Sequence, residues 1–128
     1  MELETAVQII SDNYKGENNS FIYYLHEKNL HAEEAFWELY DSIAALTLCG
    51  AEKSIAMTEQ IAQIYHRFLK YIIFHFDPND AFSLENFPQN YIDYLERMEY
   101  ALMAYSTGSI RLISHDAFAL QKPEQQNS

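Results

Sequence analysis

The stretch YHRFLKYIIFHFDP, residues 65–78, predicts the end of a long helix and with it the fold class of the chain. At about 100° per residue, six apolar side chains within residues 51–76 fall in one arc, which predicts the core face of a helix. These side chains are Ile61, Tyr65, Phe68, Leu69, Ile72 and Phe76. Asp77-Pro78 ends the helix, because proline has no N–H and restricts the residue before it.

The polar side chains of this stretch do not form one cluster. His66 and Lys70 lie opposite the predicted core arc, and His75 lies about half a turn from His66, so the two imidazoles cannot share a site. We expect His75 to face the carbonyl end of the helix, where a cation is favoured. Tyr71 and Phe74 make the second half of the helix apolar nearly all round, which favours a central place in a bundle over an interface.

Further helical patterns with short connections predict an all-α fold. We expect a single-domain antiparallel helical bundle of four or five helices over residues 1–120, with a flexible C-terminal tail over residues 121–128. Gly16, Gly50 and Gly108 are placed where helices end, and Gly50 suits a left-handed cap. The predicted helices cover residues 3–15, 21–29, 31–49, 51–76 and 89–107. Residues 109–120 fit either a last amphipathic helix or a strand.

The composition limits the classes of partner. The 128 residues are 48% hydrophobic and 15% aromatic, which fits one domain with a core and argues against disorder. The formal net charge is −11, and residues 1–50 hold nine carboxylates against Lys15 and Lys28, a formal charge of −7. Such a field repels nucleic acid and anionic membrane surfaces and attracts basic proteins. Solubility explains the charge equally well.

The single cysteine and the first residues indicate the compartment. Cys49 has no second cysteine to pair with, and we expect it to be a small buried hydrophobe rather than a nucleophile. The opening Met-Glu-Leu-Glu lacks the basic region of a signal peptide. No uncharged run approaches the roughly 18 residues of a membrane span. We therefore expect a cytoplasmic protein.

A row of carboxylates beside a tryptophan is the candidate partner-binding site. Glu34, Glu38 and Asp41 stack on one side of the helix predicted over residues 31–49, with Trp37 on their flank. Like charges at this spacing destabilise a helix by roughly 0.2–0.5 kcal/mol per pair, and no Lys or Arg of the same helix relieves them. The row thus resembles a docking site for a basic partner, with Trp37 as the anchor. The alternative is that Trp37 lies under a neighbouring helix and the acids merely face water.

The sequence gives little support for a metal site or an active site. Glu27, His31, Glu34 and Glu38 approximate a helical row of the kind that binds iron, manganese or zinc, but the Glu-x-x-His pairs of di-iron bundles are absent. Exposed Glu and His at helical spacing more often form a solvated face. We expect no metal, no cofactor and no catalytic residue, since Gly-rich phosphate loops and nucleophile motifs are also missing.

Small helical bundles include the HEPN-type ribonucleases, whose signature is an arginine followed by a histidine after four to six residues. The chain is similar to them in fold class alone. Arg67 and His75 are too far apart for that signature, and Arg111 and His115 are too close.

These patterns favour a non-enzymatic binding protein. In its most concrete form, it is an inhibitor or immunity-type protein whose acidic face neutralises a basic toxin or nuclease. The alternative is a self-associating structural or regulatory module, a homodimer formed through the aromatic residues. A metal-dependent bundle comes third.

Overall fold

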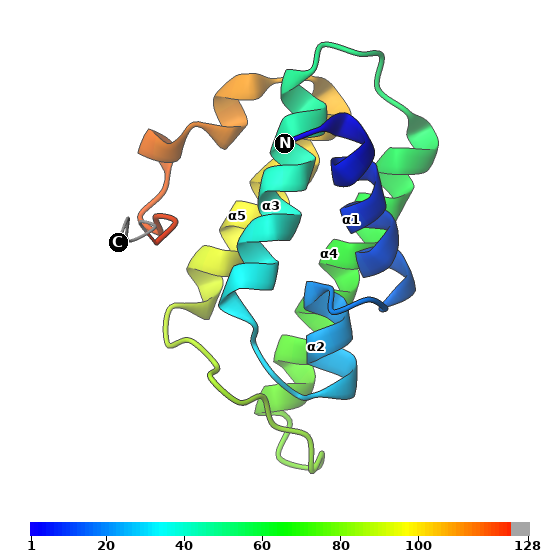
Figure 1. Ribbon diagram of the computed structural model, residues 1–128. Coiled ribbons are helices and arrows are strands. Elements are labelled where there is room, and N and C mark those ends of the chain that lie inside the picture. Colours follow the sequence, from blue (N-terminus) through cyan, green and yellow to red (C-terminus); the bar gives the residue numbers. More distant parts are fainter. Residues whose placement is uncertain (124–128) are drawn as a thin grey trace, which may run out of the picture.

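The computed structural model describes residues 1–123 and confirms the all-α prediction (Figure 1). The described chain forms five α-helices and two short 3₁₀ turns, with no strand. The helices are α1 (Leu3–Lys15), α2 (Phe21–Glu27), α3 (Glu33–Leu48), α4 (Ile55–Phe76) and α5 (Tyr91–Thr107), followed by the turns η1 (Ile110–Ile113) and η2 (His115–Ala117).

Four long helices make a bundle in which the neighbours α1 and α3, and likewise α4 and α5, run antiparallel, whereas α3 with α5 and α1 with α4 run parallel. α3 packs against α1 and α5, and α4 packs against α1, α2 and α5. Helices α1 and α4 run down the view of Figure 1 while α3 and α5 run up. The short helix α2 lies at the lower end, where α4 extends past α1 (Figure 1).

The helix ends follow local sequence signals. Gly16 and Gly108 adopt the left-handed conformation directly after α1 and α5, with φ of 67° and 74°. Ser20 caps the start of α2, because its hydroxyl accepts the Tyr23 N–H. α4 begins four residues later than predicted, because Ser54 caps it by accepting the Met57 N–H.

The core face of α4 is rotated from the predicted arc. Its buried residues are Ile61, Ile64, Phe68 and Ile72, whereas Tyr65 and Leu69 are half-buried. Phe76 is 55% exposed, so its assignment to the core was wrong. Neighbouring Ile73 and Phe74 are also exposed. The last turns of α4 therefore do not occupy the predicted central position, because they extend past α1 (Figure 1).

The segment after α5 forms neither the helix nor the strand considered for it. Residues 109–123 run through η1 and η2 in an irregular path, with Ile113 and Phe118 buried against the bundle. Gln121, in the predicted tail, donates to the carbonyls of His115 and Phe118. The rest of that tail, residues 124–128, lies outside the described residues.

Candidate binding surface

The structure places Trp37 inside the protein. Its side chain is 3% exposed, and its indole N–H donates to Glu33 Oε1 at 3.0 Å. The rings of Phe36 and Tyr40 pack edge-on against it. The prediction of Trp37 as an exposed anchor was therefore wrong, because α5 contributes Arg97 and covers this side of α3.

The carboxylates of the predicted row are also not equivalent. Asp41 is half-buried and forms an ion pair with Lys122 from the C-terminal segment. Glu34 and Glu38 remain exposed. Two carboxylates of the row, those of Glu34 and Glu38, thus remain free on α3. Because Trp37 is buried and Asp41 is paired, the four residues do not form the predicted docking site.

The Arg97 side chain covers the side of α3 that carries Trp37. Its sequence spacing fits an ion pair with Asp93, but its side chain turns inward and is 0% exposed. Nε and Nη2 both donate to the Leu120 carbonyl, and Nη1 donates to the Tyr40 hydroxyl at 3.1 Å. The guanidinium also lies over the rings of Trp37 and Phe118, at 5.2 and 4.1 Å. Arg97 therefore binds the C-terminal segment to the bundle.

The same guanidinium contacts two titratable side chains. Nη1 lies 3.1 Å from Nδ1 of His115, which reaches Arg97 from η2. Burial raises the pKa of Tyr40, and the hydrogen bond from Arg97 partly opposes that rise. All these contacts are made within the protein, so we interpret the group as structural.

A second buried polar group surrounds His31. This side chain was a candidate metal ligand, but it is buried, with Nε2 3.2 Å from Glu33 Oε2. The Tyr94 hydroxyl donates to the same carboxylate at 2.7 Å. Burial lowers the pKa of His31, and the Glu33 carboxylate partly opposes this. Burial and the Glu33 carboxylate raise the pKa of Tyr94.

Metal binding has no preformed site in residues 1–123. In this range, no three His, Cys, Asp or Glu side chains lie close enough together to hold an ion. The predicted row of Glu27, His31, Glu34 and Glu38 is broken because His31 turns into the core beside Glu33. Cys49, predicted to be buried, is exposed at the end of α3.

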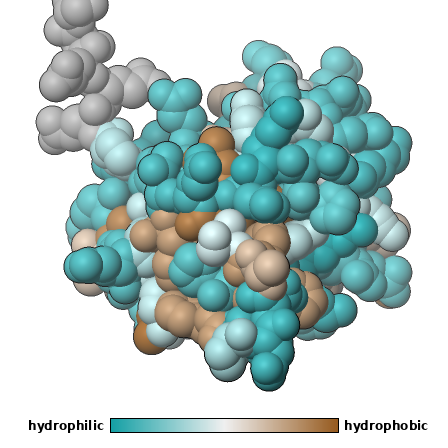
Figure 2. All heavy atoms as spheres, turned by 90° about the horizontal axis from the view of Figure 1, so that it is seen from below, coloured by the Kyte–Doolittle hydropathy of each residue, from teal (hydrophilic) through white to brown (hydrophobic). Residues whose placement is uncertain are grey.

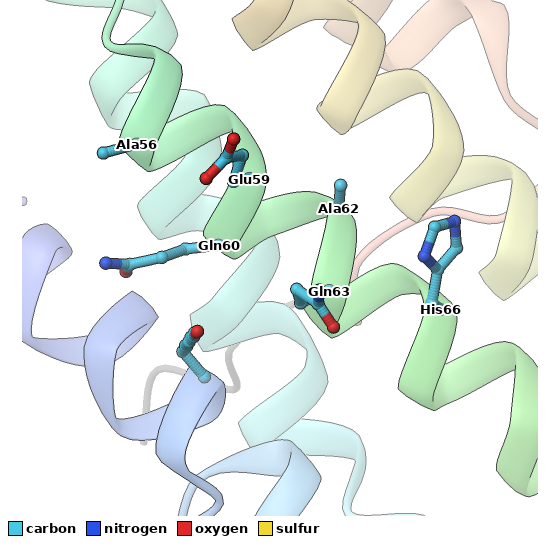
Figure 3. Close-up of a pocket in the computed structure, with 7 residues that line it drawn as sticks. Ala56, Glu59, Gln60, Ala62, Gln63 and His66 are labelled. Atoms are coloured by element: carbon cyan, nitrogen blue, oxygen red, sulfur yellow. The ribbon is translucent and has the colours of Figure 1, made fainter.

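An open polar groove runs between α1 and α4 (Figure 3). It has a volume of about 550 Å³. In Figure 3 the Gln60 side chain extends toward α1, whereas His66 projects from a later turn of α4, well away from Glu59. Glu59 and His66 are therefore not paired as an acid and a base. The groove offers polar side chains for hydrogen bonds.

A group of exposed and half-buried apolar side chains lies where α4 ends and α5 begins. We call Ile73, Phe76, Phe87, Tyr91 and Ile92 the aromatic patch. Figure 2, which views the molecule from this end, shows hydrophobic surface gathered there. The Phe76 ring lies 5.1 Å from Tyr91 and 5.4 Å from Phe87. Ile92 is 55% exposed. Monomeric proteins seldom leave such a contiguous group open to water without a use for it.

The loop between α4 and α5 holds the patch in place. His75 Nδ1 accepts the Leu84 N–H at 2.9 Å, so His75 contacts this loop and not, as predicted, the carbonyl end of its own helix. Its ring also stacks on Phe87 at 4.1 Å. Backbone bonds from Glu85 to Asn29 and from His31 to Glu85 tie the loop to the α2–α3 connection. The patch is therefore preorganised.

The sequence that contains the patch is acidic from residue 71 onward, and the exposed Lys70, one helical turn before Ile73, is the cation that directly precedes it. Residues 71–96 contain no Lys or Arg and five carboxylates: Asp77, Asp80, Glu85, Asp93 and Glu96. Asp77 follows Phe76, Asp93 follows Ile92, and Glu96 lies one helical turn beyond Ile92. The sequence contained this signal, but periodicity alone assigned Phe76 to the core.

Comparison with protein-family models, curated proteins and solved structures found no match to this chain. Among the described residues, no helix has the length and apolar character needed to cross a membrane.

Proposed function

We propose that this chain is a non-enzymatic binding protein, of the inhibitor or immunity type, that holds a basic protein partner at the aromatic patch. The observation that carries the proposal is an exposed, preorganised apolar surface within a stretch that has carboxylates and no cations. The acidic face of the sequence-based hypothesis thus moves from α3 to the junction of α4 and α5.

The two features of the patch have different roles in binding. Burial of one Phe or Ile side chain contributes roughly 1.5–3 kcal/mol, so Phe76 and Ile92 supply affinity. Carboxylates such as Asp77 and Glu96 attract and orient a cationic partner, and this contribution falls with ionic strength. Occlusion of a basic active site by such a surface is the proposed inhibitory mechanism.

The same exposed side chains also favour a second candidate, the homodimer. Two copies joined at the patch would bury Phe76 and Ile92, but they would also bring both sets of carboxylates together. Repulsion between like charges opposes that contact. We therefore place the basic partner first and the homodimer second.

The decisive experiment compares matched alanine variants. Phe76→Ala and Ile92→Ala remove exposed patch residues, and Ile55→Ala removes an 80% exposed residue at the opposite end of α4. We expect a photo-crosslinker at Ile73 to capture a basic protein with the unmodified chain and with Ile55→Ala, and to lose it with either patch variant. Capture should weaken between low and moderate salt.

Two results would contradict the proposal. Equal capture by all variants would show that the aromatic patch is not the partner-binding site. A dimer in light scattering that dissociates in Phe76→Ala would favour the homodimer. Circular dichroism of each variant checks that the bundle is intact.

A further inference from the structure

A second site of opposite charge lies between the end of α1, helix α2 and the middle of α4. It is a pocket of about 270 Å³, separate from the aromatic patch. Its charged and hydrogen-bonding side chains are Lys15, His26, Glu27, Arg67 and Tyr71, and its remaining lining is Gly16 and Ile22.

The end of α1 positions the arginine of this pocket. Gly16 ends α1 with φ of 67°, and the Arg67 Nη1 donates to the Tyr14 carbonyl at 2.8 Å. A Cβ at Gly16 would lie 3.8 Å from that Nη1 and from Ile22, so the backbone here lines the pocket closely. The guanidinium is thereby fixed, while Nε and Nη2 have no hydrogen-bond partner among residues 1–123.

The opposite wall presents a coupled pair. His26 Nδ1 lies 2.7 Å from the Tyr71 hydroxyl. Burial raises the pKa of Tyr71, so the phenol keeps its proton at neutral pH. When the imidazole is protonated, its Nδ1–H donates to Tyr71, and the phenol O–H is free to donate to a ligand. Glu27 Oε1 lies 3.7 Å from His26 Nε2.

Neither cation of the pocket is paired with a carboxylate. Lys15 and Arg67 have no carboxylate within 4.0 Å among the described residues, and the one carboxylate that lines the pocket, that of Glu27, lies beside His26. Two unpaired cations that line one small pocket of an acidic protein favour an anionic ligand.

We propose that this pocket binds the phosphate group of a small molecule. A phosphate dianion has several acceptor oxygens, which match the free N–H groups of Arg67, the Lys15 ammonium and the phenol of Tyr71. The volume suits a phosphate with a small substituent and not a large ligand. This site is independent of the proposed partner-binding patch.

The chain contains its own reporter for this binding. Gly16, Gly50 and Gly108 are its three glycines, and of these Gly16 alone lines the pocket. The experiment titrates labelled protein, in a buffer without phosphate, with inorganic phosphate and separately with glycerol 3-phosphate, a phosphomonoester with a small substituent. Sodium acetate and sodium chloride at equal ionic strength are the controls. We expect a saturable shift of the Gly16 amide signal with phosphate, while Gly50 and Gly108 stay unchanged.

Matched charge variants test the assignment. Lys15 makes no hydrogen bond or ion pair with the described residues, so Lys15→Gln should fold normally and weaken phosphate binding by about fivefold or more. Arg111→Gln, an equal charge change at the exposed turn η1, should leave binding unchanged.

The outcomes separate cleanly. Binding of both phosphate compounds supports a phosphomonoester as the ligand, and binding of inorganic phosphate alone supports free phosphate. A Gly16 shift that acetate or chloride reproduces would overturn the proposal, as would equal weakening by Lys15→Gln and Arg111→Gln. No shift at Gly16 with either phosphate compound would also overturn it.

Discussion

Replacement of Arg97 by alanine should loosen the C-terminal segment and destabilise the whole bundle. Arg97 is fully buried and provides donors to the Leu120 carbonyl and the Tyr40 hydroxyl. Its truncation removes both contacts, leaves the Tyr40 hydroxyl without this partner, and opens a cavity beside Trp37 and Phe118. Loss of a buried side chain of this size costs about 3–5 kcal/mol of unfolding free energy.

A second variant separates charge from packing. Arg97→Met fills most of the volume and removes a buried charge that has no carboxylate partner among residues 1–123. The gain from avoided desolvation offsets part of the lost hydrogen bonding, so we expect a loss of about 1–3 kcal/mol. The difference between Arg97→Ala and Arg97→Met then measures the contribution of packing.

Urea unfolding followed by circular dichroism gives these free energies, and hydrogen exchange localises the change. Amides of residues 110–121 should exchange faster in Arg97→Ala, whereas Arg111→Ala, exposed on η1, should change stability by less than about 0.5 kcal/mol. A loss below about 1 kcal/mol in Arg97→Ala would refute the reasoning. So would a large loss without faster exchange in residues 110–121.

Three further predictions follow from burial and charge. Ile64→Ala should cost about 2–5 kcal/mol in urea unfolding and His66→Ala less than about 0.5 kcal/mol, because only Ile64 is buried; similar losses would contradict the observed phase of α4. Because burial lowers the pKa of His31, the unfolded chain binds more protons there, so stability should fall as the pH drops through about 6.5. The difference between the urea midpoints at pH 7.5 and 5.5 should be smaller in His31→Gln than in the unmodified protein. An equal difference in the two proteins would exclude His31 as the cause. Glu96→Lys should weaken capture of a basic partner in the crosslinking assay, whereas Glu38→Lys on α3 should not; the reverse order would return the binding site to α3.

The helices were predictable because their ends depend on neighbouring residues. Gly16, Gly108 and Asp77-Pro78 stop the chain locally, whatever packs around it. The phase of α4 was less predictable, because periodicity shows that a helix has an apolar side but not how far its neighbours extend. Phe76 lies beyond the part of α4 that α1 covers, so it is exposed although it continues the apolar arc.

The exposure of Trp37 on α3 was not predictable for a related reason. Trp37 borders a row of carboxylates in the sequence, but its exposure depends on α5 and on the segment that follows it. An arginine is normally expected at the surface, and no local pattern indicates that Arg97 turns inward to bind the Leu120 carbonyl. The aromatic patch carried a usable signal, since residues 71–96 combine aromatic side chains with carboxylates and have no cation.

Three of the cations bind backbone carbonyls instead of carboxylates. Lys53 donates to the carbonyls of Leu46 and Thr47 at the end of α3, and Arg67 and Arg97 likewise bind backbone carbonyls. These three side chains satisfy helix ends and the C-terminal segment instead of neutralising carboxylates. Among the described residues, Lys122 alone of the lysines and arginines forms an ion pair. Among the described residues, every carboxylate except that of Asp41 therefore lacks a lysine or arginine within 4.0 Å, and the resulting field supports the proposal of a basic protein at the aromatic patch.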